Sequence, residues 1–264
     1  MVWFVSHHYV ASASQTANVT SPFFYSFNSV GILNESGFLS DSTSPYWWVN
    51  SGGEMIASTT GTGQTIQGSL PELSTWRTLY LIANPVDTDN GYHPQNIFRL
   101  LTRSQWQNTK EQAYFKVNTN NLSTSPNRDV SNGLLLFSRY YDSSNTYYAG
   151  LRVDGAVVIK KKINGTYYTL AYKKILPGTY NRNTNPNLIP QNTWVGLKVE
   201  TSNNADGSVS LNLYTDIGQT GKWALQLSTL DNNIGGKALI NQSYTGIRTD
   251  FMDVEFDNFR IEKI

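Results

Sequence analysis

Short runs of β-branched and aromatic residues, separated by turns rich in Gly, Asn and Pro, repeat along almost the whole chain. Helical periodicity is nearly absent, and this pattern constrains the fold more than any other feature of the sequence. Roughly a dozen candidate strands follow one another at short intervals, with Arg77–Ile82 counted among them. Such an order predicts an all-β fold, a two-sheet antiparallel β-sandwich that forms one domain over residues 22–264.

Two turn dipeptides specify the local topology between residues 147 and 172. Asp154-Gly155 and Asn164-Gly165 each lie between β-prone runs, and both supply the positive-φ residues that tight hairpins need. We therefore expect a three-stranded meander here. Side chains alternate between the two faces of a strand, so the residues that share one face can be read from the sequence. On the first two strands these sets are Tyr148, Gly150 and Arg152, and Val158, Lys160 and Lys162.

Composition and charge narrow the function classes. The formal net charge is only +1 in 264 residues, so no global charge favours nucleic acid or an anionic membrane surface as a partner. No run reaches the ~20 apolar residues of a membrane span, and the lack of cysteine excludes disulfides and thiolate chemistry. Residues 1–21 are expected to be a flexible tail or the remnant of a signal peptide. An Asn-, Ser- and Thr-rich chain of this kind favours a secreted or cell-surface protein. The sequence leaves the oligomeric state open, and a monomer is the default expectation.

Positive charge is concentrated in one part of the chain. Residues 139–182 contain eight basic side chains and two acidic ones. The basic residues stand among tyrosines, and tyrosine rings stack on sugars while arginine donates paired hydrogen bonds to carboxylates. The segment therefore indicates a surface for an anionic polysaccharide, although strand lysines can also simply protect an exposed sheet edge.

Several short motifs resemble concanavalin A-like jelly rolls, a superfamily of lectins, glycoside hydrolases and polysaccharide lyases. They are the segment Tyr46–Gly53, the strand pattern from Arg139 through Gly155 to Lys162, and the closing Phe256–Ile261. The resemblance implies a jelly roll with a carbohydrate groove on its concave sheet. It does not decide among the activities that this fold supports.

A looser likeness connects the chain with jelly-roll uronate lyases. Those enzymes use a Gln-x-His strand, an arginine strand and a Tyr-Phe-Lys-Ala-Gly strand. This chain has His93 and Gln95 in reversed order, then Arg99, and Tyr-Tyr-Ala-Gly at 147–150. It departs from the pattern at two places, because Tyr148 stands at the lysine position and Arg152 at the catalytic tyrosine position.

The leading hypothesis is a polysaccharide lyase that cleaves an acidic, uronate-containing polymer by β-elimination without a required cofactor. Gln95 and Arg99 would neutralise the uronate carboxylate, and His93 or a groove tyrosine, Tyr140 or Tyr148, would take the proton. Neighbouring parts of the polymer would be bound by Arg139, Arg152, Lys160, Lys162 and Tyr168.

Other interpretations remain open from the sequence. A non-catalytic carbohydrate-binding module would use the same face, and a structural subunit of an extracellular filament fits the composition alone. A glycoside hydrolase would need paired carboxylates, for which Asp253, Glu255 and Asp257 are the candidates. Asp257 is also the expected ligand of a structural calcium ion, with a solvated acidic face as the alternative.

Overall fold

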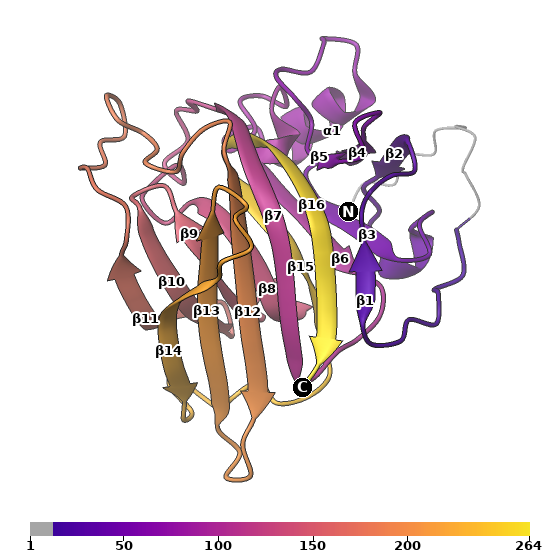
Figure 1. Cartoon of the computed structure of the whole chain (residues 1–264). Helices are drawn as coiled ribbons and strands as arrows, with labels where there is room; N and C mark the ends of the chain where they lie inside the picture. The colour runs from indigo at the N-terminus through magenta and orange to yellow at the C-terminus, as the bar shows by residue number, and fades with distance from the viewer. Residues whose placement is uncertain (1–12) are drawn as a thin grey trace.

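The computed structural model describes residues 13–264, and these form two antiparallel sheets packed face to face (Figure 1). The predicted two-sheet sandwich is confirmed. The nine-stranded sheet contains β1 (Phe23–Tyr25), β2 (Gly31–Asn34), β4 (Glu54–Ala57), β5 (Gly63–Gln64), β7 (Thr109–Asn120), β12 (Trp194–Asn203), β13 (Val209–Ile217), β14 (Ala224–Asp231) and β16 (Met252–Lys263). The seven-stranded sheet contains β3 (Trp47–Ser51), β6 (Ile97–Thr102), β8 (Gly133–Asp142), β9 (Asn145–Arg152), β10 (Ala156–Ile163), β11 (Thr166–Lys174) and β15 (Tyr244–Asp250).

Each sheet contains both hairpin-connected neighbours and neighbours that are distant in sequence. The nine-stranded sheet has the order β14-β13-β12-β7-β16-β5-β4-β2, with β1 paired to β16, and the seven-stranded sheet has the order β11-β10-β9-β8-β15-β6-β3. Strands β15 and β16 each occupy the middle of a sheet and are separated only by Phe251. The end of the chain therefore completes both layers at once.

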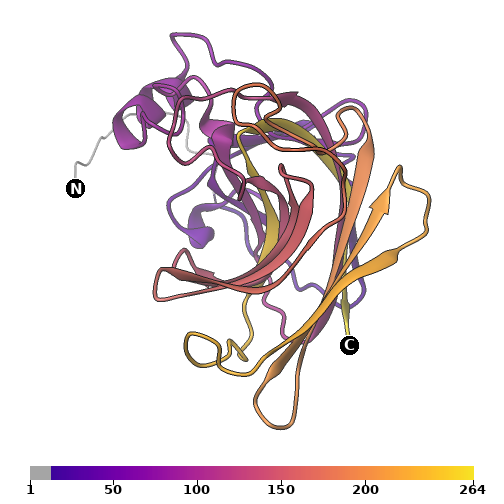
Figure 2. The same cartoon turned by 90° about the vertical axis from the view of Figure 1, so that its left-hand side faces the viewer.

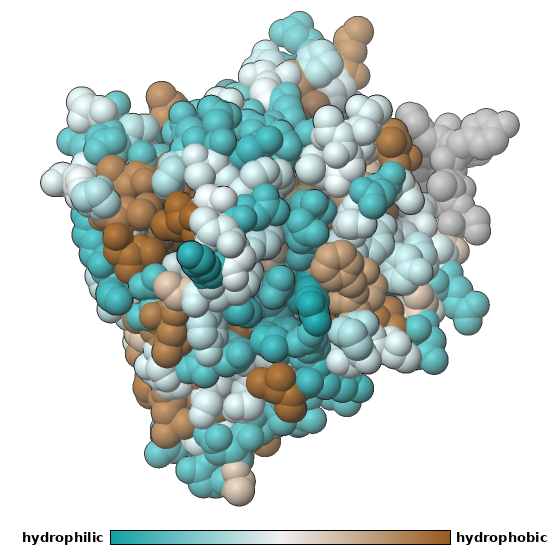
Figure 3. All heavy atoms as spheres, in the orientation of Figure 1, coloured by the Kyte–Doolittle hydropathy of each residue, from teal (hydrophilic) through white to brown (hydrophobic). Residues whose placement is uncertain are grey.

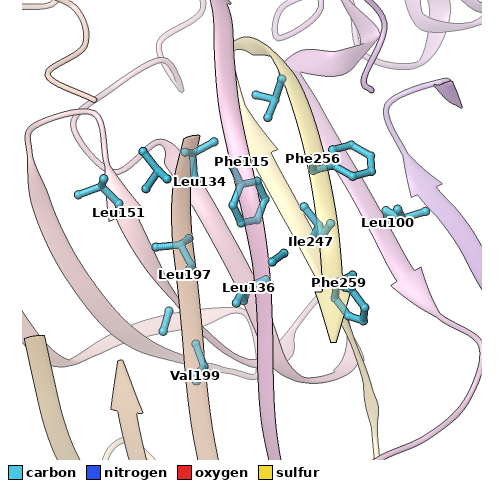
Figure 4. Packing of buried hydrophobic residues seen from close by; sticks show 14 of the residues in the cluster. Leu100, Phe115, Leu134, Leu136, Leu151, Leu197, Val199, Ile247, Phe256 and Phe259 are labelled. Carbon is cyan, nitrogen blue, oxygen red and sulfur yellow. The ribbon is translucent and has the colours of Figure 1, made fainter. Parts of the chain in front are cut away.

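The inward faces of the two sheets form the main hydrophobic core (Figure 4). Alternate residues of each strand supply it, as the period of two requires. An aromatic cluster fills one side of it, where the rings of Trp47 and Phe259 meet edge to face with their centroids 4.7 Å apart. The adjacent Trp48 points to the opposite face of the sheet, and its Nε1 donates to the Ser36 carbonyl at 2.9 Å. The two tryptophans thus lie on opposite faces, as alternation predicts.

The meander predicted from the two turn dipeptides is present as β9, β10 and β11. Gly155 and Gly165 have φ values of +77° and +82°, in the left-handed region that the turns require. The register places Lys160 opposite Tyr148, and Lys162 opposite Tyr167. In Figure 2 these pink strands curve, and their concave side faces away from the nine-stranded sheet.

The predicted strand Arg77–Ile82 is wrong, because this segment is part of the α-helix α1 (Thr75–Ala83). Ser74 caps the helix, since its side chain accepts a hydrogen bond from the Arg77 N–H. The apolar run that favoured a strand stays largely in solvent, with Leu79 and Ile82 43% and 68% exposed. Two short 3-10 helices, η1 (Leu39–Asp41) and η2 (Pro94–Asn96), complete the elements of the described chain.

The expected tail at residues 1–21 lies partly outside the described residues. Over residues 13–21 the backbone donates hydrogen bonds from Ser14 to Ser42 and from Ala17 to Pro45, at 3.1 and 2.9 Å. The division of the chain into tail and domain stays a prediction. Within residues 13–264, no helix has both the length and the apolar character that a membrane crossing needs.

Candidate functional site

The outer face of the seven-stranded sheet is hollowed along its middle strands. Two adjoining hollows of roughly 250 and 400 Å³ share the same floor. Their common lining residues are Ile97, Tyr167, Arg248 and Asp250. We call this surface the groove. Its lining includes residues of β6, β8, β9, β10, β11 and β15.

Two arginines face each other on the floor of the groove. Arg99 in β6 is paired directly with Arg248 in β15, so two cationic side chains stand on the same face of neighbouring strands. Like charges in this arrangement destabilise a sheet unless an anion compensates them. Asp250 supplies one compensation, because Arg248 Nε donates to Asp250 Oδ1 at 2.8 Å. The other carboxylate oxygen of Asp250 is buried and has no partner among the described residues.

The electrostatic surroundings keep Arg248 charged. Burial disfavours the guanidinium charge, but the Asp250 carboxylate and the nearby Tyr148 outweigh it and raise the pKa of Arg248 above its ordinary value. The floor of the groove therefore presents two permanent cations and one carboxylate. A bound carboxylate would improve this balance.

Two neighbouring tyrosines at the groove have pKa values displaced in opposite directions. Tyr148 in β9 and Tyr167 in β11 meet edge to face, with ring centroids 6.1 Å apart. Burial raises the pKa of Tyr148, which is only 5% exposed. Burial acts in the same direction on Tyr167, but the cations of Arg248 and Lys162 outweigh it and lower the pKa of Tyr167 below its ordinary value. One phenol thus keeps its proton while its neighbour loses it more readily.

Lysines and a third tyrosine complete the groove. Lys160 and Lys162 in β10 lie over the ring of Tyr167. The distance from Nζ to the ring centroid is 5.7 Å for Lys160 and 4.6 Å for Lys162. Tyr140 in β8 lines the neighbouring hollow and donates its hydroxyl hydrogen bond to Asn50 Oδ1 at 3.1 Å. Of the predicted site residues, the groove therefore contains Arg99, Tyr140, Tyr148, Lys160 and Lys162.

His93 and Gln95 have other surroundings. Gln95 is fully buried, and its side-chain amide donates to the Gly68 carbonyl and to Asp253, both at 2.9 Å. Its predicted role beside Arg99 is therefore wrong, because it cannot reach a ligand from the protein interior. His93 lies between Ser69 and Asp89 and is not among the residues that line the groove.

Arg139 and Tyr168 were expected to bind substrate, and the structure contradicts both. Arg139 is fully buried and donates to the carbonyls of Leu239 and Gln107. A β-bulge between Phe137 and Arg139 turns Arg139 inward and brings Tyr140 to the groove instead. Tyr168 is paired with the buried Lys161, on the face opposite to Tyr167.

Arg152 lies on the same outward face as Tyr148, but its guanidinium is largely occupied by contacts within the protein. Its Nη2 lies 3.0 Å from Asp154 Oδ2, its Nε donates to the Val130 carbonyl, and only 11% of its side chain is exposed. It lines neither hollow. The charge that the sequence assigned to the groove at this position is therefore neutralised by an acidic neighbour.

Sequence reasoning missed Arg248 and Tyr167, the two residues at the centre of the groove. Alternation would have found Tyr167, because the Asn-Gly turn fixes Lys162 opposite Tyr167 rather than Tyr168. Arg248 had no such signal. Its position depends on the pairing of β15 with β6, which are separated by more than a hundred residues.

The acidic residues near the end of the chain belong to the other sheet. Glu255 pairs with Lys116 at 3.0 Å, and Asp253 is buried, where it accepts hydrogen bonds from Gln95 and Asn121. Neither contributes to the groove, which argues against their use as a hydrolase pair there. Asp257 has one buried oxygen, Oδ1, without a partner in the described part of the chain.

That unpartnered oxygen fits one ligand of a calcium ion, which usually takes six to eight oxygens. Burial raises the pKa of Asp257, and a bound cation would oppose that effect. Over residues 13–264 no group of three or more acidic, histidine or cysteine side chains is placed to hold a metal. Calcium at Asp257 stays a prediction.

No known protein-family model matches the chain, and no curated protein matches it by sequence. Among solved structures, it is similar to the carbohydrate-binding module CBM66 from Bacillus subtilis, with a TM-score of 0.49 and 14% identity over 82% of this chain and 95% of the other. A β-glucanase from Bacillus licheniformis has a TM-score of 0.48 at 9% identity, covering 94% of this chain and all of its own. A PL-14 alginate lyase from Aplysia kurodai has a TM-score of 0.38 at 11% identity, covering 89% and 99%. At these scores the similarity carries no information on what this chain binds, so its function has to be argued from the groove.

Proposed function

We propose that the groove binds an acidic polysaccharide and cleaves it by β-elimination next to a uronate carboxylate. The observation that carries this proposal is that Tyr167, a phenol with a lowered pKa, lines the same groove as the cross-strand pair Arg99 and Arg248. β-Elimination requires these elements, because the proton α to a carboxylate becomes acidic only when the carboxylate charge is neutralised.

The roles follow from the positions and charges of the side chains. Arg99 and Arg248 neutralise the uronate carboxylate in the ground state and stabilise the additional charge that develops in the transition state. Tyr167, as the phenolate, takes the proton from the carbon α to the carboxylate. A double bond forms between this carbon and its neighbour while the bond from the neighbour to the glycosidic oxygen breaks, and Tyr148, which is still protonated, donates its proton to that leaving oxygen.

The lysines support binding of the polymer on either side of the cleaved bond. Lys160 lines one hollow and Lys162 the other. Ammonium groups on flexible stems suit carboxylates whose position varies along a chain. Together with the exposed tyrosine ring they fit an anionic sugar polymer outside the cell, in agreement with the expected export of the protein.

A non-catalytic carbohydrate-binding module is the alternative. It is favoured because Arg248 already donates a hydrogen bond to Asp250, so part of its charge is neutralised within the protein. The test is to incubate the protein with a panel of uronate polymers and to follow the ultraviolet absorbance of the unsaturated uronate product. The proposal expects product from at least one polymer. Binding without product on every polymer that binds would favour the module.

A further inference from the structure

A second constellation lies outside the groove, around the one histidine of the described chain. The hydroxyl oxygen of Ser69 lies 2.8 Å from His93 Nε2, and His93 Nδ1 lies 3.0 Å from Asp89 Oδ2. Ser69 is exposed, whereas the side chains of His93 and Asp89 are 20% and 26% exposed. The order hydroxyl, imidazole, carboxylate is the arrangement that activates a serine nucleophile, and it is recognised by geometry rather than by sequence position.

The residues on both sides of the serine are held by hydrogen bonds. The N–H of Gly68 donates to Asp253 Oδ2 at 2.7 Å, and its carbonyl accepts from the fully buried Gln95. The N–H of Leu70 donates to the Tyr92 carbonyl at 2.8 Å. Ser69 therefore stands between two fixed residues, and its hydroxyl is presented to His93 from a rigid support.

The carboxylate is held as firmly. Asp89 Oδ1 accepts from the Ser123 hydroxyl at 2.6 Å, and Oδ2 accepts from Asn96 Nδ2 at 3.3 Å in addition to its contact with His93. A carboxylate fixed in this way orients the imidazole with a proton on Nδ1, which leaves Nε2 free to accept the proton of Ser69.

We propose that Ser69, His93 and Asp89 form a second active site, which hydrolyses esters of small carboxylic acids. Ser69 Oγ bonds to the ester carbonyl carbon while its proton passes to His93 Nε2. The bond to the alcohol oxygen then breaks, and that oxygen takes the proton from His93. A water molecule attacks the carbonyl carbon of the acyl-serine and gives one proton to His93. The bond from that carbon to Ser69 Oγ then breaks, Oγ takes the proton back from His93, and the carboxylic acid is released.

The class of substrate follows from the openness of the site. The Ser69 N–H has no hydrogen-bond acceptor in the described part of the chain, so it is available to stabilise the developing oxyanion. One donor gives less stabilisation than the two or more of efficient amidases. An ester, whose alcohol leaves more easily than an amine, is therefore the substrate class, and the exposed position of Ser69 favours a small acyl group on a larger alcohol.

The proposal is tested by reacting the full chain with a fluorophosphonate, which forms a stable bond with activated serines, and by mapping the labelled peptide by mass spectrometry. We expect label on Ser69, none at this position in Ser69→Ala, and a labelling rate about 10²–10⁴-fold lower in His93→Ala. Hydrolysis of 4-nitrophenyl acetate should fall with the labelling in both variants. Ser40→Ala is the matched control, because Ser40 is also exposed and contacts Asp41 at 2.9 Å but has no histidine beside it.

Two outcomes would overturn this proposal. One is a wild-type protein that is not labelled at Ser69. The other is labelling at Ser69 that persists unchanged in a folded His93→Ala variant, with circular dichroism used to verify the fold. Tyr167→Phe should label like the wild type, so failure of this site and failure of the groove can be distinguished.

Discussion

The outer faces of the two sheets use charge in opposite ways. On the nine-stranded sheet, Lys116 and Lys110 pair with Glu255 and Glu262 at 3.0 and 2.8 Å. On the seven-stranded sheet, Arg99, Lys160 and Lys162 have no acidic partner within 4 Å among residues 13–264. Figure 3 shows the first of these faces as a mixed surface, where hydrophilic residues lie between hydrophobic patches.

This difference in charge pairing gives a way to distinguish a ligand-binding face from a face that only contacts solvent. A sheet gains little from charges that stand unpaired on its surface, and pairing them with carboxylates is the simple solution that the nine-stranded sheet uses at Lys110 and Lys116. Where the chain leaves cations unpaired beside one another, as in the groove, the missing anion is expected from outside the protein. The following predictions test this difference, from the largest expected effect to the smallest.

The largest effect is expected from Tyr167→Phe in the groove. Loss of the phenolate should lower turnover of a uronate polymer about 10²–10⁴-fold, the usual contribution of a positioned base. Tyr214→Phe is the control on the other sheet. Lys198 Nζ lies 5.1 Å from the centroid of the Tyr214 ring, but the Tyr214 hydroxyl donates its hydrogen bond to Glu200. Equal turnover in the two variants, measured by product absorbance, would exclude Tyr167 as the base.

Arg99→Ala should weaken binding of a uronate oligosaccharide about 10- to 100-fold, because hydrogen bonds to charged groups contribute about 1.5–3 kcal/mol. Lys116→Ala, which removes a cation that is already paired with Glu255, should leave the affinity within about twofold of the wild type. Isothermal titration calorimetry gives both values. Similar losses in the two variants would mean that binding follows net charge rather than the groove.

Asp257 on the nine-stranded sheet has a carboxylate oxygen, Oδ1, without a partner among the described residues. If it binds calcium, Ca²⁺ at ten times its Kd should stabilise the fold by about 1.4 kcal/mol, measured as a rise in Tm that a chelator reverses. Asp257→Asn should abolish the rise, whereas Glu255→Gln should keep it. The absence of any rise in the wild type would contradict calcium binding at Asp257.

The smallest effect is a shift in tyrosine ionisation. A lowered pKa means that Tyr167 loses its proton below the ordinary tyrosine pKa of about 10. The contribution of this group to stability grows as the pH rises through that window and is absent at lower pH, because only the phenolate benefits from the nearby cations. When tyrosinate absorbance is followed against pH, the part of the change that occurs at the lowest pH should therefore be lost in Tyr167→Phe and kept in Tyr214→Phe. An unchanged early component would contradict the lowered pKa.

The sequence predicted those parts of the structure that depend on local geometry. Alternation and two turn dipeptides were enough to place Tyr148, Lys160 and Lys162 on one face, since neither feature requires knowledge of distant strands. The helix α1 was missed because Leu79, Leu81 and Ile82 form an apolar run typical of strands, yet they remain partly exposed on the helix. Its cap at Ser74 was the available signal.

The errors within the site have two different causes. Gln95 was assigned to the groove from the order of a motif, but the turn of η2 directs it into the interior toward Asp253. Arg248 was missed because a contact between β15 and β6 depends on topology, which local patterns do not contain. Charge counting found the basic segment correctly, but it could not show that Arg152 is neutralised by Asp154.

The bulge in β8 decides which side chain the groove receives. Ser138, the extra residue at the bulge, is buried and its hydroxyl has no partner within the described chain. If the same residues ran through this point with regular pleating, Arg139 would turn outward and Tyr140 inward. The bulge therefore places an aromatic wall in the groove where regular pairing of the same sequence would place a cationic one. Loss of the bulge through a shift of register would change the polymer that the groove accepts without any substitution.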